Sequence, residues 1–380
     1  MIYLDNAATS FPKPEGVYRA VDEVTRCTGN PGRAGHALAR RAEAEIEGVR
    51  VRAARFFGTR WPERVIFTLN ATDALNMAIK GFLQAGDHVV TTSLEHNSVS
   101  RPLAALARRG ISFAKVGCDT EGRVDVESLE AAVMPRTRLV VLTWVSNVWG
   151  TVQPVEAVAE MCRRHGVKLL VDAAQAAGHV RIDMQAMGID MLACSGHKGL
   201  LGPPGTGLLV VGADVDLLPW REGGTGVVSH QVSQPDFYPQ RLESGTPNTA
   251  GIAGLGAGID FLNQVGLPEV IGHESCLLGA LREGLAAIPS VRVYGPARAA
   301  DQTSLLSFNV EGWDPMEVAA VLDQSFGISC RAGLHCAPWA HQALGTYPTG
   351  TVRFSVGYFN TAGEIEQAIQ AVRALAGAGR

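Results

Sequence analysis

The chain has 380 residues, of which 46% are hydrophobic and 18% are charged. This balance is typical of a folded globular protein rather than a disordered one, and the length favours two domains. Its net charge of −4 provides no overall basic field, so we expect neither nucleic acid nor an anionic membrane surface as a partner.

Secretion and membrane insertion are also disfavoured by the sequence. The N-terminal residues Met1-Ile2-Tyr3-Leu4-Asp5 lack the basic and apolar regions of a secretory signal. No apolar run approaches the roughly 20 residues needed to cross a bilayer. The seven cysteines contain no C-x-x-C pair, so we expect reduced thiols, a cytoplasmic location and no bound metal.

A basic cluster near the N-terminus alternates with Glu43, Glu45 and Glu47. Its members are Arg33, Arg40, Arg41, Arg50, Arg52 and Arg55. The mixed charges predict a solvated helix face rather than a surface for a polyanion.

Short apolar strands alternate with amphipathic helices from about residue 60 to 215. The repeat of Leu75, Ile79, Phe82 and Leu83 predicts one helix, and Pro102 marks the expected start of another. The strands are expected at 65–69, 88–92, 111–116, 139–145, 167–171, 191–194 and 207–211. This alternation predicts an α/β fold with a mainly parallel seven-stranded sheet.

The pattern changes beyond residue 215. A Gly-rich loop is followed by segments typical of a smaller α+β domain: helices over about 252–287, a strand at 304–310, a helix at 315–326, a strand at 352–356 and a last helix from 362. We therefore expect a large domain over residues 15–255 and a small domain built from residues 1–14 and 256–380.

Three strand ends of the predicted sheet carry an unusual set of polar residues. Asp172 follows one apolar strand, Ser195-Gly196-His197-Lys198 follows the next, and Asn70-Ala71-Thr72-Asp73 lies between a strand and a helix. In open α/β sheets, functional residues gather beyond the carboxyl ends of the strands. We therefore expect these three segments to lie together.

Their residue types suit pyridoxal 5′-phosphate (PLP). An Asp such as Asp172 can pair with the pyridinium nitrogen, Lys198 can form a Schiff base, and the turn at Thr72 offers N–H and hydroxyl donors to a phosphate. Each segment alone also suits a capping residue or an ordinary surface loop. The combination, in this order, favours the cofactor site.

Seven sequence strings carry a more specific resemblance. They are Tyr3-Leu4-Asp5-Asn6-Ala7-Ala8, Glu95-His96-Asn97, Val145-Ser146-Asn147-Val148-Trp149-Gly150, Val171-Asp172-Ala173-Ala174-Gln175, Ser195-Gly196-His197-Lys198, Glu243-Ser244-Gly245-Thr246-Pro247-Asn248 and Arg331-Ala332-Gly333-Leu334-His335-Cys336. In order, and over residues 2 to about 375, they resemble the cysteine desulfurase and selenocysteine lyase family. That family belongs to the class V aminotransferases of fold type I.

The resemblance implies a role for each residue around the cofactor ring. His96 stacks over the pyridine ring, Asp172 pairs with the ring nitrogen, and Gln175 hydrogen-bonds the phenolic oxygen. Lys198 is the Schiff-base lysine.

It also implies how the phosphate and the substrate are held. Asn147 and Arg353 bind the substrate carboxylate, for which a planar guanidinium is well suited, and Arg331 and His36 are further candidates on the substrate side. The phosphate is held by four side chains, the last of them from the second subunit of a homodimer: Thr72, Ser195, His197 and Thr246.

Cys336 distinguishes the reaction that the resemblance implies. Lys198 removes the Cα proton of bound cysteine, and a thiolate at Cys336 attacks the substrate sulfur, leaving a persulfide and releasing alanine. A free thiol has a pKa of about 8.5, and Arg331 and His335 nearby would favour the anion. Cys330 ends the stretch Phe326-Gly327-Ile328-Ser329 and is interpreted as structural. A Cys330/Cys336 metal pair lacks the ligand spacing and the other donors of a zinc site.

The length of the cysteine loop and three substitutions refine the comparison. Only 16 residues separate Cys336 from Arg353, which resembles the short-loop group that commonly uses a partner protein as sulfur acceptor. Ala71 stands where relatives often carry a hydroxyl, Leu334 replaces a frequent His, and Trp149 is expected to place a bulky ring near the substrate side.

Other functions stay open from the sequence. The substrate can be L-cysteine or selenocysteine, and an aminotransferase, epimerase or kynureninase-like reaction on the same fold would not need a thiol at Cys336. A partner-binding scaffold without chemistry is disfavoured by the intact Lys198 and Asp172. The segment 202–207 lacks the G-x-G-x-x-G spacing of a dinucleotide site.

Overall fold

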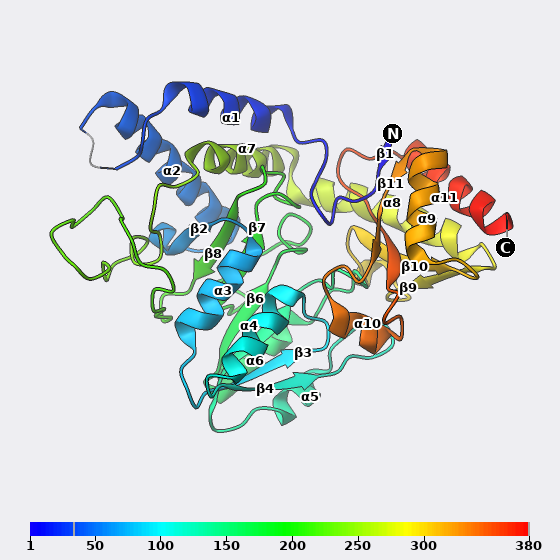
Figure 1. Ribbon diagram of the computed structural model, residues 1–380, viewed down its shortest axis with the longest axis horizontal. Helices are drawn as coiled ribbons and strands as arrows, with labels where there is room; N and C mark the ends of the chain where they lie inside the picture. Colours follow the sequence, from blue (N-terminus) through cyan, green and yellow to red (C-terminus); the bar gives the residue numbers. More distant parts are fainter. Residues whose placement is uncertain (33–34, 379–380) are drawn as a thin grey trace.

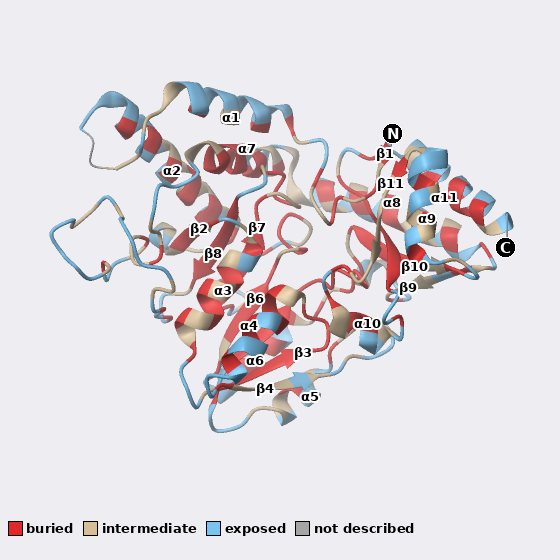
Figure 2. Ribbon diagram, in the orientation of Figure 1, coloured by how far each residue is buried: buried red, intermediate tan, exposed pale blue. Residues whose placement is uncertain are grey.

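The computed structural model describes residues 1–32 and 35–378, which form a larger and a smaller part (Figure 1). The larger part is built on the central sheet, and the smaller part lies beside it and contains the N-terminal residues and the last helix. Buried residues concentrate on the strands and on the inward faces of the helices (Figure 2).

Within the described residues, seven strands form the central sheet in the order β2-β8-β7-β6-β5-β3-β4. The pairs β3–β4, β3–β5, β5–β6 and β6–β7 are parallel, whereas β8 runs antiparallel to both β2 and β7. The strands are β2 (Val65–Thr68), β3 (His88–Thr92), β4 (Ser112–Val116), β5 (Thr137–Thr143), β6 (Lys168–Asp172), β7 (Met191–Ser195) and β8 (Gly207–Val211). The predicted mainly parallel sheet is confirmed.

Helices cover both faces of this sheet because alternate strand residues point to opposite sides. Val89 packs in one apolar cluster with α3 and α4, and its neighbour Val90 packs in another with α6 and α7. The helices of this part are α1 (Glu15–Cys27), α2 (Ala37–Phe56), α3 (Ala71–Phe82), α4 (Asn97–Ala107), α5 (Val126–Ala131), α6 (Val155–His165) and α7 (Thr249–Val265), with a 3-10 turn η1 (Pro62–Arg64).

The predicted helix start at Pro102 is wrong. Helix α4 begins at Asn97, and Pro102 lies inside it. His96 provides the stronger start signal because its ring nitrogen accepts the N–H of Ser98 at 3.0 Å. A side chain that accepts an orphan N–H stabilises the first turn of a helix.

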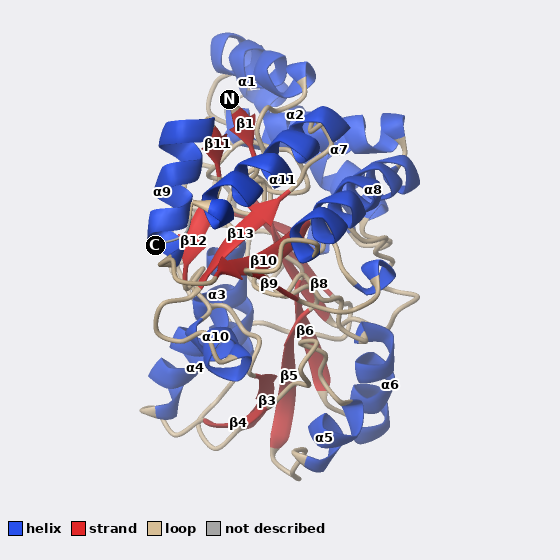
Figure 3. Cartoon of the chain, turned by 90° about the vertical axis from the view of Figure 1, so that its right-hand side faces the viewer, coloured by secondary structure: helices blue, strands red, loops and turns tan. Residues whose placement is uncertain are grey.

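The smaller part contains a four-stranded antiparallel sheet in the order β12-β13-β10-β9, as far as the chain is described. Helices α8, α9 and α11 pack on it (Figure 3), and their leucines and isoleucines join Phe308 and Phe354 in one cluster. The elements are α8 (Leu267–Ala286), β9 (Val291–Tyr294), η2 (Ala299–Asp301), β10 (Leu305–Val310), α9 (Pro315–Phe326), β11 (Ile328–Ser329), β12 (Arg331–Gly333), α10 (Pro338–Leu344), β13 (Thr351–Ser355) and α11 (Ala362–Gly377).

The N-terminal residues belong to this smaller part. Strand β1 (Ile2–Tyr3) pairs in parallel with β11, with Ile2 opposite Ile328. The expected boundary at residue 255 falls inside α7, whose Leu255 and Ile259 pack in the core of the larger part. We therefore propose Gly266, between α7 and α8, as the domain boundary.

One member of the basic cluster departs from the predicted solvated face. Arg50 on α2 is only 2% exposed, and its guanidinium binds both carboxylate oxygens of Glu243 at 2.7 and 3.0 Å. The prediction failed there because α2 turns this side chain toward a carboxylate from a distant segment. Arg33 lies outside the described residues.

The helices were compared with the length and hydropathy of membrane spans. Over the described ranges, none of them has both the length and the apolar character that a bilayer span requires.

Candidate active site

A cavity of about 260 Å³ lies where the carboxyl ends of β5, β6 and β7 meet the start of α3. Thr143, Asp172 and Ser195 are the last residues of those strands, and parallel pairing brings them together. The described residues that line the cavity are Asn70, Ala71, Thr72, His96, Ser98, Thr143, Val145, Asn147, Asp172, Ala174, Gln175, Ser195, His197 and Lys198.

Asp172 and Lys198 supply opposite charges to this cavity. Asp172 is 4% exposed, and its Oδ1 accepts the N–H of Ala174 at 2.9 Å. Burial raises the pKa of Asp172, while that hydrogen bond and the charge of Lys198 oppose the shift. Burial lowers the pKa of Lys198 to about 8, although Asp172 opposes this shift. A larger fraction of Lys198 is therefore a neutral amine at physiological pH than for an exposed lysine.

The start of α3 offers main-chain donors at one end of the cavity. The side chain of Asn70 caps the helix by accepting the N–H of Asp73 at 2.9 Å. The N–H of Ala71 lies 3.2 Å from Oγ of Ser195, to which it donates. Although Ala71 has no hydroxyl, its main-chain N–H therefore holds the side chain of Ser195 in place. Helix N-termini of this kind bind phosphate.

A chain of hydrogen bonds links the side chains beside that helix start. Oγ1 of Thr72 is 2.7 Å from Oγ of Ser98, which is 2.8 Å from Nδ1 of His96. Burial lowers the pKa of His96 to about 4, so its ring is neutral at physiological pH. Sequence reasoning missed Ser98, for which the only signal was its position just after the helix-capping His96.

Unfilled hydrogen-bonding atoms test whether a phosphorylated pyridine fits here. Nε2 of Gln175 donates to the carbonyl oxygen of Ala7 at 3.0 Å. Oε1 of Gln175 and Nδ1 of His197 are buried, and neither has a partner within the described residues. Such atoms are usually satisfied, and a ligand with polar substituents would satisfy them. Together with the amine of Lys198, the carboxylate of Asp172 and the hydroxyls at the helix start, these atoms form a set of polar groups that fits PLP.

Glu95 is a further buried carboxyl behind the cavity. Its Oε1 accepts the hydroxyl of Thr92 at 2.7 Å and the N–H of Thr143 at 3.0 Å. Burial raises the pKa of Glu95 to about 8. The carboxyl is therefore mostly protonated near neutral pH, which avoids a second negative charge close to Asp172.

Arg353 on β13 joins the small domain to the cavity wall. Its side chain is nearly inaccessible; Nη2 donates to Oδ1 of Asp5, and Nη1 to the carbonyl oxygen of Asn147, both at 3.1 Å. These two contacts fix the guanidinium plane, which favours bidentate binding of a carboxylate. Sequence reasoning assigned no role to Asp5, because its partner lies at the other end of the chain.

Cys336 is the exposed residue of a turn after β12 in which His335 and Ala337 are buried. Nη2 of Arg331 donates to Sγ of Cys336 at 3.9 Å. The supporting role predicted for His335 is wrong: its buried ring hydrogen-bonds Thr351 through Nε2, and burial holds its pKa well below the usual range. A neutral imidazole supplies no positive charge. Burial raises the pKa of Cys330 to about 12, which fits a structural thiol.

The sequence and these elements together match one protein family. The family model described as Aminotransferase class-V matches residues 2–368. The chain belongs to the class-V aminotransferase family.

Individual relatives match this chain over almost its whole length. A protein of Methanothermobacter thermautotrophicus named "Probable cysteine desulfurase" is 38% identical, over 100% of this chain and 95% of that protein. A cysteine desulfurase of Serratia proteamaculans is 34% identical, over 99% and 93%. The apo structure of cysteine desulfurase from Thermococcus onnurineus NA1 matches with a TM-score of 0.92 and 34% identity, over 99% and 95%. These matches confirm the predicted fold type I architecture.

Trp149 does not lie on the substrate side, where it was expected. Its side chain is 1% exposed and belongs to the core of the larger part. A Cβ on Gly122 would come within 2.6 Å of the indole ring, so the ring packs directly against that glycine. It is not among the described residues that line the cavity.

Two predicted site residues lie away from their own subunit's cavity. Thr246 lines a separate cavity of about 420 Å³ together with Asn30 and Gly32. His36 follows Gly32 by four residues, is exposed and caps α2 by accepting the N–H of Ala39 at 3.3 Å. Residues 33 and 34, between Gly32 and His36, lie outside the described residues. Within one chain, neither Thr246 nor His36 is among the described residues that line the Lys198 cavity.

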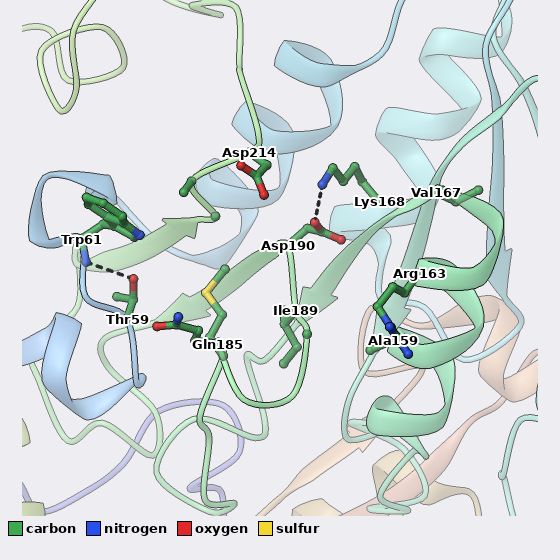
Figure 4. A pocket seen from close by; sticks show the side chains of 15 residues that line it. Thr59, Trp61, Ala159, Arg163, Val167, Lys168, Gln185, Ile189, Asp190 and Asp214 are labelled. Carbon is green, nitrogen blue, oxygen red and sulfur yellow. Dashed lines mark hydrogen bonds and ion pairs between the residues drawn. The ribbon is translucent and has the colours of Figure 1, made fainter.

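Another cavity, of about 420 Å³, opens at the amino end of β6 and β7 (Figure 4). Lys168 and Asp190 form an ion pair of 2.8 Å in its wall. Its described lining residues include none that the sequence analysis assigned to the site. Since ligands in open α/β sheets bind at the opposite edge, the cavity that holds Lys198 is the candidate active site.

Proposed function

We propose that this chain is a PLP-dependent cysteine desulfurase that converts L-cysteine to L-alanine and retains the sulfur on Cys336 as a persulfide. The observation that carries the proposal is the turn with an exposed thiol tied to the Lys198 cavity: Nδ2 of Asn147, a lining residue, donates to the carbonyl oxygen of His335 at 2.7 Å. The names of relatives that are 33–38% identical support the same activity.

The cavity residues would hold PLP by their chemistry. Asp172 would pair with the ring nitrogen, His96 would lie against the ring, Gln175 would bond the phenolic oxygen, and Lys198 would bind the aldehyde carbon. The phosphate would be held at the start of α3 by Thr72, Ser195 and His197. When bound, PLP withdraws electrons from the substrate and so makes the Cα proton acidic and the Cβ–S bond easier to break.

The chain itself supplies the proton transfers and the nucleophile. Arg353 orients the substrate carboxylate, and Lys198 takes the Cα proton. The thiolate of Cys336 then forms a bond to the substrate sulfur as the Cβ–S bond breaks, and the electron pair of that bond stays on Cβ. Cβ takes up the proton that the substrate thiol loses, and Lys198 returns its proton to Cα, which gives alanine. L-Cysteine and one enzyme thiol thus yield L-alanine and one enzyme persulfide. Because Cys336 is exposed, we propose a protein thiol as the final sulfur acceptor.

A substrate test separates this reaction from its alternatives. The purified holoenzyme is incubated with L-cysteine, L-selenocysteine or cysteine sulfinate, and alanine, keto acids and the mass of the Cys336 peptide are measured. We expect one alanine per sulfur atom and a mass gain of one sulfur on Cys336. A keto acid with a pyridoxamine form of the cofactor would instead indicate an aminotransferase, and alanine from selenocysteine alone would indicate a selenocysteine lyase.

Cofactor loading is expected to depend on pH through Lys198. Only the neutral amine attacks an aldehyde, and the pKa of Lys198 is lowered to about 8. The rate of covalent PLP uptake by the apoprotein should therefore fall about tenfold per pH unit below about 8 and level off above it. Borohydride reduction followed by mass spectrometry of the Lys198 peptide measures this rate. A rate that keeps rising to about pH 10 would contradict the lowered pKa.

We propose a homodimer in which each chain completes its partner's site. Thr246, Asn30 and Gly32 line a cavity separate from their own subunit's Lys198 cavity, and a two-fold interface would give both subunits the same exchange of residues. The family resemblance assigns Thr246 to the phosphate of the other subunit. A hydroxyl donor to a charged phosphate from across the interface fits this arrangement.

Mixed dimers test this exchange. Thr246→Ala should weaken PLP binding about tenfold or more, because hydrogen bonds to charged groups are strong. In a tagged heterodimer of Thr246→Ala and Lys198→Ala chains, the cavity that keeps Lys198 receives an intact Thr246. That cavity should take up PLP with wild-type affinity, as measured by covalent incorporation. Affinity as weak as in the Thr246→Ala homodimer would show that Thr246 acts within its own subunit.

A further inference from the structure

The turn that carries Cys336 has an unusual main-chain conformation. His335 and Cys336 have φ angles of 47° and 58°, which non-glycine residues rarely adopt and which cost free energy. The N–H of Ala337 donates to the carbonyl oxygen of Leu334 at 2.8 Å, closing a turn around the two residues. Positive φ at both central positions is the pattern of a type I′ turn. Such a turn persists only where surrounding contacts hold it.

Two hydrogen bonds from the large domain hold this turn. Nδ2 of Asn147 donates to the carbonyl oxygen of His335, and the main-chain N–H of Asn97 donates to that of Cys336, both at 2.7 Å. Asn147 is 9% exposed, so its amide is fixed in a buried setting. The second bond comes from the main chain at the start of α4 and does not depend on the side chain of residue 97.

Asn147 also contacts the proposed carboxylate-binding arginine. Its carbonyl oxygen accepts Nη1 of Arg353 at 3.1 Å, and Nη2 of the same guanidinium binds Asp5. One residue therefore links the guanidinium to the cysteine turn, through its main chain on one side and its side chain on the other. A displacement at either end is transmitted through a single residue.

We propose that Asn147 is a positioning residue for Cys336. Asn147 holds the turn in its left-handed conformation and fixes the position of the thiol relative to Arg353. This is distinct from a contact between Asn147 and substrate, because the amide is bonded to the turn itself. The effect on sulfur transfer rests on the proposed function, whereas the effect on the turn does not.

Hydrogen exchange in the holoenzyme without substrate tests the turn directly. In Asn147→Ala, the amides of the peptide covering residues 332–340 should exchange about tenfold faster than in the wild type, since one buried hydrogen bond is lost. Asn147→Asp, which keeps the shape but replaces the donor by an acceptor, should show the same acceleration. Asn97→Ala is the matched control: it retains the main-chain donor, and its exchange should stay within about twofold of the wild type.

A kinetic measurement separates positioning from substrate binding. At saturating L-cysteine, the first-turnover rate of persulfide formation on Cys336 should fall about tenfold in Asn147→Ala, a loss that weakened carboxylate binding alone would not cause. Unchanged exchange at residues 332–340 in both Asn147 variants, with PLP still bound, would overturn the proposal. If neither the wild type nor any variant made alanine from L-cysteine, the proposed function would be wrong. The hydrogen-exchange result would still decide the role of Asn147.

Discussion

Replacing Lys198 by alanine is expected to lower the rate of alanine formation from L-cysteine about 10³-fold or more. A positioned general acid–base group contributes about 10²–10⁴-fold, and Lys198 would also be the covalent anchor of PLP. Its position in the cavity with Asp172, and its pKa lowered to about 8, suit both tasks. Alanine release and, after borohydride reduction, the mass of the peptide that contains residue 198 provide the two measurements.

Lys168 offers a matched control for this substitution. It forms an ion pair with Asp190 at the opposite edge of the sheet (Figure 4). Lys168→Ala should keep covalent PLP and lose little activity. If Lys198→Ala kept wild-type turnover, or if PLP were found covalently bound elsewhere, the assignment of the Schiff-base lysine would be wrong. Retention of bound PLP by Lys198→Ala would separate loss of chemistry from loss of the cofactor.

The local sequence pattern was sufficient for much of the fold. Apolar runs bounded by turn residues located β3 and β8 to the residue, and the helical repeat around Leu75 located α3. Parallel pairing of β6 and β7 brought Asp172 and Ser195 to one edge of the sheet, where the carboxyl ends of parallel strands meet. Strand β2 also ends at this edge, because β2 and β7 both run antiparallel to β8, and so the start of α3 joins the same cavity. The strand ends were therefore informative before any tertiary contact was known.

Features that depend on distant partners could not be predicted in this way. Arg50 is buried because it forms an ion pair with Glu243, and Asp5 binds Arg353 because it pairs with Ser355 at the end of β13. His335 is adjacent to Cys336 in sequence, but it is neutral because the fold buries its ring. In each case the deciding contact joins the residue to a segment that its local sequence does not indicate.

Replacing Cys336 by alanine is expected to reduce sulfur release from L-cysteine about 10²-fold or more, because the step loses its nucleophile. PLP binding should be unchanged, since Cys336 is not among the described residues lining the cavity. Sulfide released in the presence of reductant, alanine, and the mass of the residue 336 peptide are measured together. Cys276→Ala removes another exposed thiol, on α8, and should leave all three at wild-type values.

The same variant can show at which step the thiol acts. Lys198 and the cofactor set are intact in Cys336→Ala, so the Cα proton of L-cysteine should still exchange with deuterium from solvent. Exchange that continues while sulfur release is lost would place the defect at Cβ–S cleavage, after the proton step of Lys198. Equal sulfide release by Cys336→Ala and the wild type would instead exclude a persulfide on Cys336. Sulfur would then leave without attack by an enzyme thiol, and the turn held by Asn147 would not contribute to Cβ–S cleavage.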